Sequence, residues 1–209
     1  MTEEMKRCRP LIIVSSRTGN TMTVAHAIHD AYAAAGAALV RADALPESLE
    51  AFNPVLLGFW CDRGMAPEDM KAAAAKLVGK RLGCFATIGG DPSADRAKDW
   101  MARTSRALAE AGSSNTLEAT FLSQGRIDPK LAEAMEKMMR AKAGPAQTPE
   151  EAAKAEAERE KREARRRAAE THPDRLDCLA AVEAFRALLA DAGEKQAACG
   201  RQGEGLADD

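Results

Sequence analysis

Residues 11–21 of this 209-residue chain read LIIVSSRTGNT, and this stretch decides the fold. The first four residues are apolar and mostly β-branched, which is typical of a strand buried on both faces of a parallel sheet. Further on, apolar residues recur at helical spacing, at Val24, Ala27 and Ile28. The stretch therefore predicts a buried strand, a short polar loop and a helix that begins at once.

The polar loop between that strand and that helix is suited to hold an anion. The first backbone N–H groups of a helix have no carbonyl partner, and the helix dipole places positive charge behind them. Ser16, Thr18 and Thr21 add hydroxyl donors. Asn20 adds an amide, and Gly19 allows a sharp turn with positive φ. A phosphate is the expected ligand, and the alternative is an ordinary capped strand-to-helix turn.

The same loop excludes two other classes of phosphate-binding site. A nucleoside-triphosphate loop needs a Lys after its second glycine to reach the terminal phosphates, and here Asn20 follows Gly19. A dinucleotide fingerprint needs three glycines in G-x-G-x-x-G spacing, and this loop has a single glycine. What remains is a loop that binds a monophosphate through hydroxyl and main-chain donors.

Residues 16–21, SRTGNT, resemble the S-x-T-G-N-T phosphate loop of the flavodoxins, which bind flavin mononucleotide (FMN). The resemblance implies that four side chains contact the FMN phosphate around the turn at Gly19, namely Ser16, Thr18, Asn20 and Thr21. Flavodoxins usually carry a small polar residue where this chain has Arg17. Its guanidinium is expected either to add a contact to the phosphate or to point into solvent. The resemblance covers roughly residues 11–142.

Strand and helix patterns alternate along the following residues. Further strands are expected at 37–41, 55–59, 82–86 and 117–122, and further helices around residues 70–77, 100–108 and 131–138. This alternation predicts an α/β fold with a five-stranded parallel sheet covered on both faces. The resemblance implies that the sheet is flavodoxin-like and doubly wound. Ligands of such sheets bind outside the carboxyl ends of the strands, where the strand order reverses. The loops after Val14, Phe59 and Ala86 are therefore the ones to inspect.

The loop at residues 59–64, FWCDRG, is suited to hold the flavin ring. An aromatic side chain at a strand tip can stack on one ring face, and the resemblance assigns this role to Trp60. The alternative for Trp60 is a place in the core or at its rim. Cys61, beside Asp62, stands where the family often has Gly. A flip of the peptide bond is more costly at Cys than at Gly, so Gly64 is another candidate hinge for such a flip. A reactive thiol at Cys61 is a further alternative.

The loop at residues 87–92, TIGGDP, follows the next expected strand. Its paired glycines, Gly89 and Gly90, let the main chain approach the edge of the ring, and Thr87 can donate to the ring carbonyls. The family often has a second aromatic in this loop, and this chain has none, so one ring face is expected to be open. Asp91 is expected to cap the entry to the next helix, and no catalytic residue is predicted.

The last third of the chain departs from this alternation. Residues 150–170 are almost entirely Ala, Glu, Lys and Arg, with oppositely charged i, i+4 pairs, which predicts an exposed helix. The expected division is an FMN-binding core at 1–143, a charged helical insertion at 144–170, a last core helix at 171–193 and a disordered tail at 194–209. Within residues 1–143, the last helix is expected to carry an apolar stripe of Leu131, Met135 and Met138. The apolar stripe of the last core helix is expected to be Leu179, Val182, Phe185 and Leu189.

Composition limits the function classes. A net charge of −2 gives no basis for binding nucleic acid or an anionic membrane. The chain has no run of 18 apolar residues and no pattern of a signal peptide, so a cytoplasmic location is expected. Its five cysteines include no C-x-x-C pair, and its three histidines lie far from them in sequence, so no disulfide framework and no metal site are indicated.

The expected function is that of an FMN-binding electron-transfer protein, a monomer or weak dimer, that passes electrons between a reductase and an acceptor enzyme. In that role the flavin does the chemistry and the protein positions it. The alternative is an NAD(P)H-dependent FMN oxidoreductase acting on a quinone or another small conjugated acceptor, which an open ring face favours. A third hypothesis is a flavin-free interaction module of the same fold.

Overall fold

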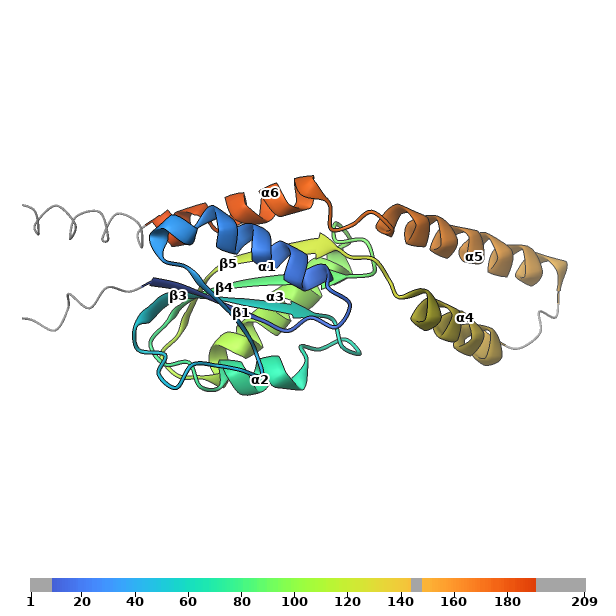
Figure 1. The fold of residues 1–209 in the computed structure, drawn as a ribbon. Coiled ribbons are helices and arrows are strands. Elements are labelled where there is room, and N and C mark those ends of the chain that lie inside the picture. Colours follow the sequence, from blue (N-terminus) through green and yellow to red (C-terminus); the bar gives the residue numbers. More distant parts are fainter. Residues whose placement is uncertain (1–8, 144–147, 191–209) are drawn as a thin grey trace, which may run out of the picture.

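The fold is built on one parallel sheet of five strands (Figure 1). The computed structural model describes residues 9–143 and 148–190. The strands are β1 (Arg9–Val14), β2 (Ala38–Arg41), β3 (Phe52–Trp60), β4 (Arg81–Ile88) and β5 (Thr116–Gln124). Their order is β2-β1-β3-β4-β5, and every neighbouring pair is parallel. The flavodoxin-like, doubly wound α/β class predicted from the sequence is confirmed.

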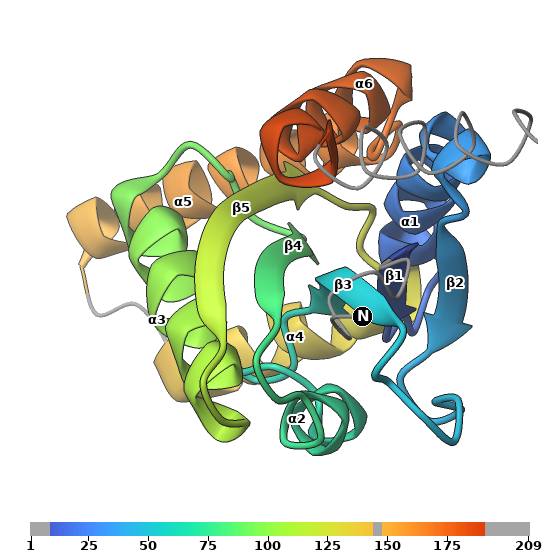
Figure 2. The ribbon, with the colours of Figure 1, turned by 90° about the vertical axis from the view of Figure 1, so that its left-hand side faces the viewer.

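Helices cover both faces of the sheet (Figure 2). They are α1 (Asn20–Ala31) and α6 (Arg175–Ala184) on one face, and α2 (Glu68–Ala74) and α3 (Asp95–Ala111) on the other. Successive side chains of a strand point to opposite faces, so β1 contributes to two cores. Ile12 and Val14 pack in the core under α1 and α6, whereas Leu11 and Ile13 pack in the core under α2 and α3. Burial on both faces explains the uninterrupted apolar run that marks this strand.

The return from α1 to β2 uses a short helical turn and a glycine. The 3₁₀ helix η2 (Ala33–Ala35) follows α1, and Gly36 ends it with a φ of 74°. A positive φ costs a glycine little, because it has no Cβ to clash with the neighbouring carbonyl. This turn returns the chain to the sheet for β2, the outer neighbour of β1.

The last core helix packs as expected except at one residue. Phe185 and Leu189 are buried, but Leu179 is 55% exposed, and Ala181 is buried instead. The packed face of α6 is centred on Ala181 and on Phe185, one turn later. Leu179 precedes Ala181 by two residues, a rotation of about 200° around the helix, so it points away from the sheet. The prediction that Leu179 belongs to the buried stripe is therefore wrong.

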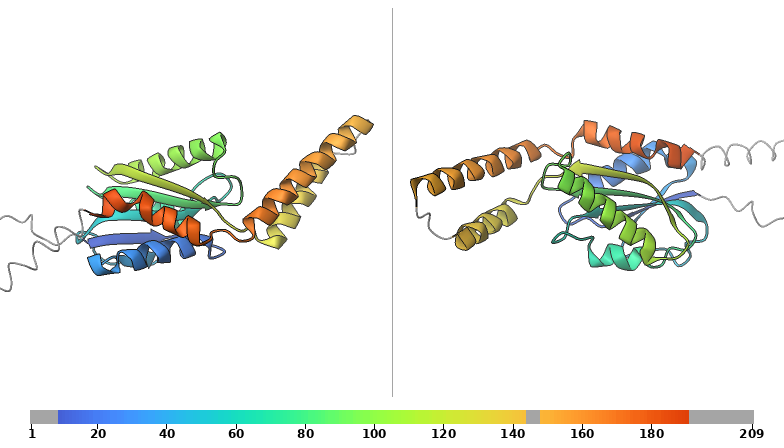
Figure 3. Two further views of the ribbon diagram at one scale, coloured as in Figure 1. Left: turned by 90° about the horizontal axis from the view of Figure 1, so that it is seen from above. Right: turned by 180° about the vertical axis from the view of Figure 1, so that it is seen from behind.

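Two helices project from the core as an arm (Figures 1 and 3). α4 (Pro129–Ala143) and α5 (Pro149–Ala169) lie side by side beyond the end of β5. Arg162 of α5 donates from Nε and Nη2 to the carboxylate of Glu136 on α4, at 3.3 Å each. We call this pair the α4–α5 arm. Within the part of the chain that the structure describes, no helix is both long and apolar enough to cross a membrane.

The apolar stripe of α4 is not covered by the sheet. Leu131, Met135 and Met138 are 43%, 40% and 51% exposed. The helix itself was predicted correctly, but its expected place in the core is wrong, because periodicity shows that one face is apolar and not what covers it. α5 is mostly exposed, as its charge pattern predicts. The expected tail at 194–209 lies outside the described residues.

Candidate functional site

The loops after β1, β3 and β4 meet at the carboxyl edge of the sheet. The backbone N–H of Ser15 donates to the carbonyl of Gly58 at 2.8 Å. Trp60 and Thr87 are register partners at the ends of β3 and β4. The hydroxyls of Thr21 and Thr87, both buried, lie 2.8 Å apart. The structure therefore brings together residues from all three loops that the sequence singled out.

The loop after β1 leaves the start of α1 open. Gly19 is the N-cap residue, with a φ of 91°, and a Cβ built on it would meet no atom within 4 Å. The hydroxyl of Ser16 accepts a hydrogen bond from the backbone N–H of Met22 at 3.3 Å. Thr18 is exposed, and Asn20 is the first helical residue. Open space at the positive end of a helix suits a phosphate.

Two predicted phosphate ligands are already hydrogen-bonded within the protein. The side-chain amide of Asn20 donates to the carbonyl of Arg126 at 2.8 Å, and the hydroxyl of Thr21 pairs with that of Thr87. These bonds fix the loop to its neighbours. The donors that remain for a phosphate are the hydroxyls of Ser16 and Thr18 and the first backbone N–H groups of α1.

A buried serine ties the same loop to α2. The hydroxyl of Ser15 lies 2.9 and 2.8 Å from the two carboxylate oxygens of Asp69. Asp69 also accepts from the backbone N–H of Met70 at 2.8 Å, which places its carboxylate at the start of α2. The sequence analysis missed Asp69, because it lies 54 residues from Ser15 and no local pattern joins them.

Trp60, the expected stacking residue, is half-buried at the end of β3. The guanidinium of Arg17 lies over its ring, with Cζ 5.5 Å from the ring centroid. The exposed guanidinium of Arg17 therefore lies at the ring end of the candidate site. The neighbouring Cys61 is half-buried, and burial raises the pKa of its thiol, while a backbone hydrogen bond involving Gly64 opposes that rise. A raised pKa argues against the reactive-thiol alternative, since the thiolate is the nucleophile.

The rest of that loop is a tight turn with a defined shape. Asp62 and Met65 exchange two backbone hydrogen bonds of 2.9 Å. The two residues between them, Arg63 and Gly64, have φ values of 49° and 85°, the signs that a two-residue type I′ turn requires. The indole N–H of Trp100 on α3 donates to the carbonyl of Gly64 at 2.9 Å. This contact fixes the turn to α3.

The two glycines after β4 differ in what surrounds them. A Cβ on Gly89 would lie 2.4 Å from Cγ1 of Ile127, whereas one on Gly90 would meet only Cδ1 of Ile88, at 4.0 Å. Gly89 is therefore small because Ile127 packs against it. Gly90 has open space where a Cβ would lie, and the expectation that the amides of both glycines donate to the ring stays a prediction.

Asp91 closes a turn instead of capping α3. Its Oδ1 accepts from the backbone N–H and the hydroxyl of Ser93, at 2.8 and 2.6 Å. These hydrogen bonds are the main reason that the pKa of Asp91 is lowered, and the charges of Arg165 and Lys98 add to the effect. The N-cap of α3 is Ala94, so the predicted helix cap is wrong.

A fourth loop, after β5, completes the edge and was missed by the sequence analysis. The N–H of Gly125 donates to Ile88 at 2.8 Å, and that of Arg126 donates to the carbonyl of His172 at 2.9 Å. A Cβ on Gly125 would lie 2.8 Å from Nδ2 of Asn20. The loop thus joins the start of α1, the end of β4 and the segment before α6. In the sequence, Gly125 shortly before Asp128-Pro129 indicates only a turn and does not show which residues the loop contacts.

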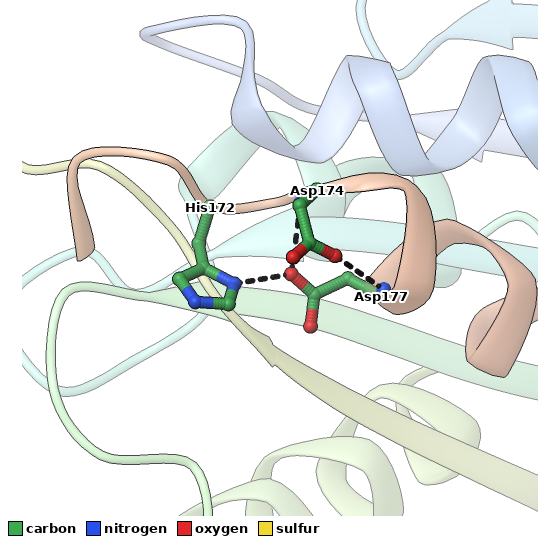
Figure 4. A group of neighbouring side chains, drawn as sticks. All are labelled: His172, Asp174 and Asp177. Atoms are coloured by element: carbon green, nitrogen blue, oxygen red, sulfur yellow. Dashed lines mark hydrogen bonds and ion pairs between the residues drawn. The ribbon is translucent and has the colours of Figure 1, made fainter. Parts of the chain in front are cut away.

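His172, Asp174 and Asp177 form a polar cluster at the start of α6 (Figure 4). The two aspartates make a capping box, each side chain accepting from the other's backbone N–H. Nδ1 of His172 is hydrogen-bonded to Asp177, and this contact raises the pKa of His172. Within the described part of the chain, these three side chains form the one group of His, Cys, Asp or Glu residues whose ligand atoms lie close enough together to bind a metal ion. The capping box accounts for their arrangement, so we assign the cluster to the helix start.

A cavity of about 670 Å³ lies elsewhere in the molecule. It is lined by residues 42–50 together with Lys76, Val78 and Lys80. None of these residues belongs to the four loops at the carboxyl edge. The candidate site is therefore defined by the loop geometry and not by this cavity.

Comparisons with known proteins agree with the fold. The family model described as Flavodoxin domain matches residues 11–186. No curated protein matches the chain. Similar solved structures include the two-electron reduced flavodoxin of Megasphaera elsdenii, which is 25% identical, with 54% of this chain and 85% of that chain covered and a TM-score of 0.42.

Two more solved structures show the same likeness. Oxidised flavodoxin 2 from Bacillus cereus is 20% identical, with 56% of this chain and 84% of that chain covered and a TM-score of 0.45. A putative flavoprotein from Bacteroides uniformis is 15% identical, with 62% and 98% covered and a TM-score of 0.41. The family model is the stronger finding, because it matches well over half of the chain, and this protein therefore belongs to the flavodoxin domain family.

Proposed function

We propose that this protein is an FMN-binding electron carrier that passes electrons between a reductase and an acceptor enzyme in the cytoplasm. Membership of the family implies a flavin cofactor, typically FMN. The observation that carries the proposal is the open start of α1 at Gly19 on the same sheet edge as Trp60. One end suits a phosphate, and the other suits an aromatic ring.

The phosphate end is proposed to act through the donors that the fold leaves available. Ser16 and Thr18 supply hydroxyls, and the backbone N–H groups of Asn20 and Thr21 at the start of α1 have no carbonyl partner within the helix. Asn20 and Thr21 hold the loop in shape through Arg126 and Thr87. A loop fixed in advance loses less conformational entropy when the ligand binds.

The ring end is proposed to act through stacking and open main chain. Trp60 stacks on one face of the ring, and the turn at Cys61, Asp62 and Gly64 borders it. Thr87 and the Gly89-Gly90-Asp91 segment flank the other edge, where Gly90 has open space. Bound FMN supplies the group that accepts and releases electrons, while these residues bind, orient and shield it.

A second candidate function is an NAD(P)H-dependent reduction of a quinone or other small conjugated acceptor. Two observations favour it. The first is that the loop at residues 87–92 has no aromatic residue to cover the second ring face. The second is that the main chain at Gly90 has open space beside that face. Steady NAD(P)H oxidation by the pure protein with a small acceptor supports this enzyme. Turnover that requires an added reductase supports the carrier.

We also propose that the insertion between β5 and α6 is longer than the charged helix alone. α4 lies beside α5 in the arm, as Figure 3 shows. The apolar stripe of α4 is exposed. The core then ends near residue 128, and the arm spans 129–170. Family members generally act with redox partners, and the arm stands on the edge of the molecule where the flavin is proposed to bind.

The phosphate end is tested by removing the hydroxyls of Ser16 and Thr18. The double variant Ser16→Ala/Thr18→Ala is expected to bind FMN roughly 100-fold or more weakly, because each charge-assisted hydrogen bond contributes about 1.5–3 kcal/mol. The matched control is Ser113→Ala/Thr116→Ala, which removes two exposed hydroxyls just before and at the start of β5. Equal FMN affinity in the two double variants, measured by quenching of flavin fluorescence, would contradict the proposed site.

A further inference from the structure

Arg17 belongs to the phosphate end of the candidate site, yet its charge lies at the ring end. The residue stands between Ser16 and Thr18 in the loop after β1. Its guanidinium carbon is 5.5 Å from the centroid of the Trp60 ring. The indole that is proposed to stack on the flavin therefore already has a cation on one face. A flavin ring that takes this face must displace Arg17.

The two possible positions of Arg17 differ in free energy. A cation–π contact at an exposed site is weak, about two- to fivefold in an equilibrium constant, and Arg17 is exposed. A charge-assisted hydrogen bond to a phosphate is stronger, about tenfold or more. A phosphate at the start of α1 can therefore draw the guanidinium away from Trp60. A ligand without a phosphate offers nothing in exchange for the lost contact.

We propose that Arg17 makes this site selective for flavins that carry a terminal phosphate. Without phosphate, Arg17 stays on Trp60 and opposes stacking of the ring. With FMN, the guanidinium moves to the phosphate and frees the indole. The inference rests on the proposed flavin site and adds to it a residue that discriminates between FMN and riboflavin, its uncharged analogue.

This arrangement predicts opposite effects of one substitution on two ligands. In Arg17→Ala, FMN loses a phosphate contact, so its Kd is expected to rise about tenfold or more. Riboflavin loses a competitor for Trp60, so its Kd is expected to fall about two- to fivefold. Arg17→Lys keeps a charge for the phosphate but stacks less well on an indole, so both shifts are expected to be smaller.

Fluorescence quenching of FMN and of riboflavin measures all four constants on the full chain. The control Arg103→Ala removes the same charge from an exposed position on α3 and is expected to shift neither ligand relative to wild type. In a Trp60→Leu background, the gain for riboflavin on removing Arg17 is expected to disappear, because no indole remains to compete for.

The outcomes separate this inference from the function on which it rests. Opposite shifts in Arg17→Ala that are absent from Arg103→Ala support the selectivity role. Shifts in the same direction for both flavins, or no shift beyond that of the control, overturn it while FMN binding by the wild type stands. A wild-type protein that binds neither flavin overturns the proposed function and the inference together.

Discussion

The hydroxyl oxygens of Thr21 and Thr87 lie 2.8 Å apart and join the start of α1 to the end of β4. The two residues are 1% and 4% exposed, so water does not compete for the bond. One hydroxyl must donate and the other accept. The spacing between the phosphate loop and the ring loop therefore depends on a polar contact inside the protein, where an unpaired hydroxyl is costly.

Replacing either threonine by valine tests that contact. Thr21→Val or Thr87→Val leaves the other hydroxyl buried without its partner, which is expected to cost about 1–3 kcal/mol of unfolding free energy. The double variant leaves no orphaned hydroxyl of the pair, so its loss is expected to be smaller than the sum of the single losses. Urea unfolding of the flavin-free wild type, the two single variants and the double variant gives the four unfolding free energies that this comparison needs. Additive losses would show that the two hydroxyls do not interact.

A methyl group on Gly125 tests the link between the fourth loop and the phosphate loop. In Gly125→Ala the new Cβ would lie 2.8 Å from the Asn20 amide and push it from the carbonyl of Arg126. That amide is the flexible end of a side chain and can move without disturbing the core. The loss of FMN-binding free energy is therefore expected to exceed the loss of unfolding free energy.

Ala102→Ser is the matched control, because it adds one atom at an exposed position on α3, away from the loops of the site. FMN affinity and stability are expected to be nearly unchanged in this variant. Titration with FMN and urea unfolding are measured on both proteins. A Gly125→Ala variant with wild-type FMN affinity would mean that the position of Asn20 does not shape the site.

The pair of His172 and Asp177 predicts a pH-dependent contribution to stability. Hydrogen bonding to Asp177 raises the pKa of His172 above its ordinary value of 6.5. The pair therefore stabilises the protein fully below pH 6.5, and this contribution is lost as pH rises through the raised pKa. The unfolding free energy of wild type minus that of His172→Gln is expected to be largest near about pH 5.5 and to shrink toward about pH 8.

Unfolding curves at several pH values measure this difference. In an Asp177→Asn background the pH dependence of the difference is expected to weaken strongly, because the carboxylate that raises the pKa is gone. A difference that grows as the pH rises would have the wrong sign for this pair.

The thiols near the site are predicted to be slow to react. Burial raises the pKa of Cys84 to about 12 and also raises that of Cys61. At about pH 8, a disulfide reagent is expected to leave Cys84 unmodified until the protein unfolds. Cys61 is expected to react more slowly than a free thiol at the same pH. Comparison of the labelling rates of wild type, Cys61→Ser and Cys84→Ser identifies each thiol. Rapid labelling that is lost in Cys61→Ser would restore the reactive-thiol alternative.

Local patterns predict the strands because those patterns have a direct physical cause, whereas the strand order follows from the resemblance to flavodoxins. A strand covered by helices on both faces must be apolar throughout, and β1, β3 and β4 are. Alternation with helices implies a parallel sheet, and a parallel sheet gathers its loops at one edge. Together with the resemblance to flavodoxins, these rules place Thr21, Trp60 and Thr87 at one edge of the sheet.

Contacts made through space were not predictable in the same way. Asp69 meets Ser15, and Gly125 meets Asn20, because of the paths that loops take over the sheet edge. Neither pair leaves a periodic signal in the sequence. The exposed stripe of α4 was misplaced for a related reason, since amphipathicity describes a helix and not its neighbour.

The visible absorption spectrum of the protein after incubation with excess FMN and removal of free flavin tests the central claim most directly. The account predicts a yellow protein that retains FMN in stoichiometric amount and loses most of it in the Ser16→Ala/Thr18→Ala variant. A folded protein that remains colourless under these conditions would contradict it.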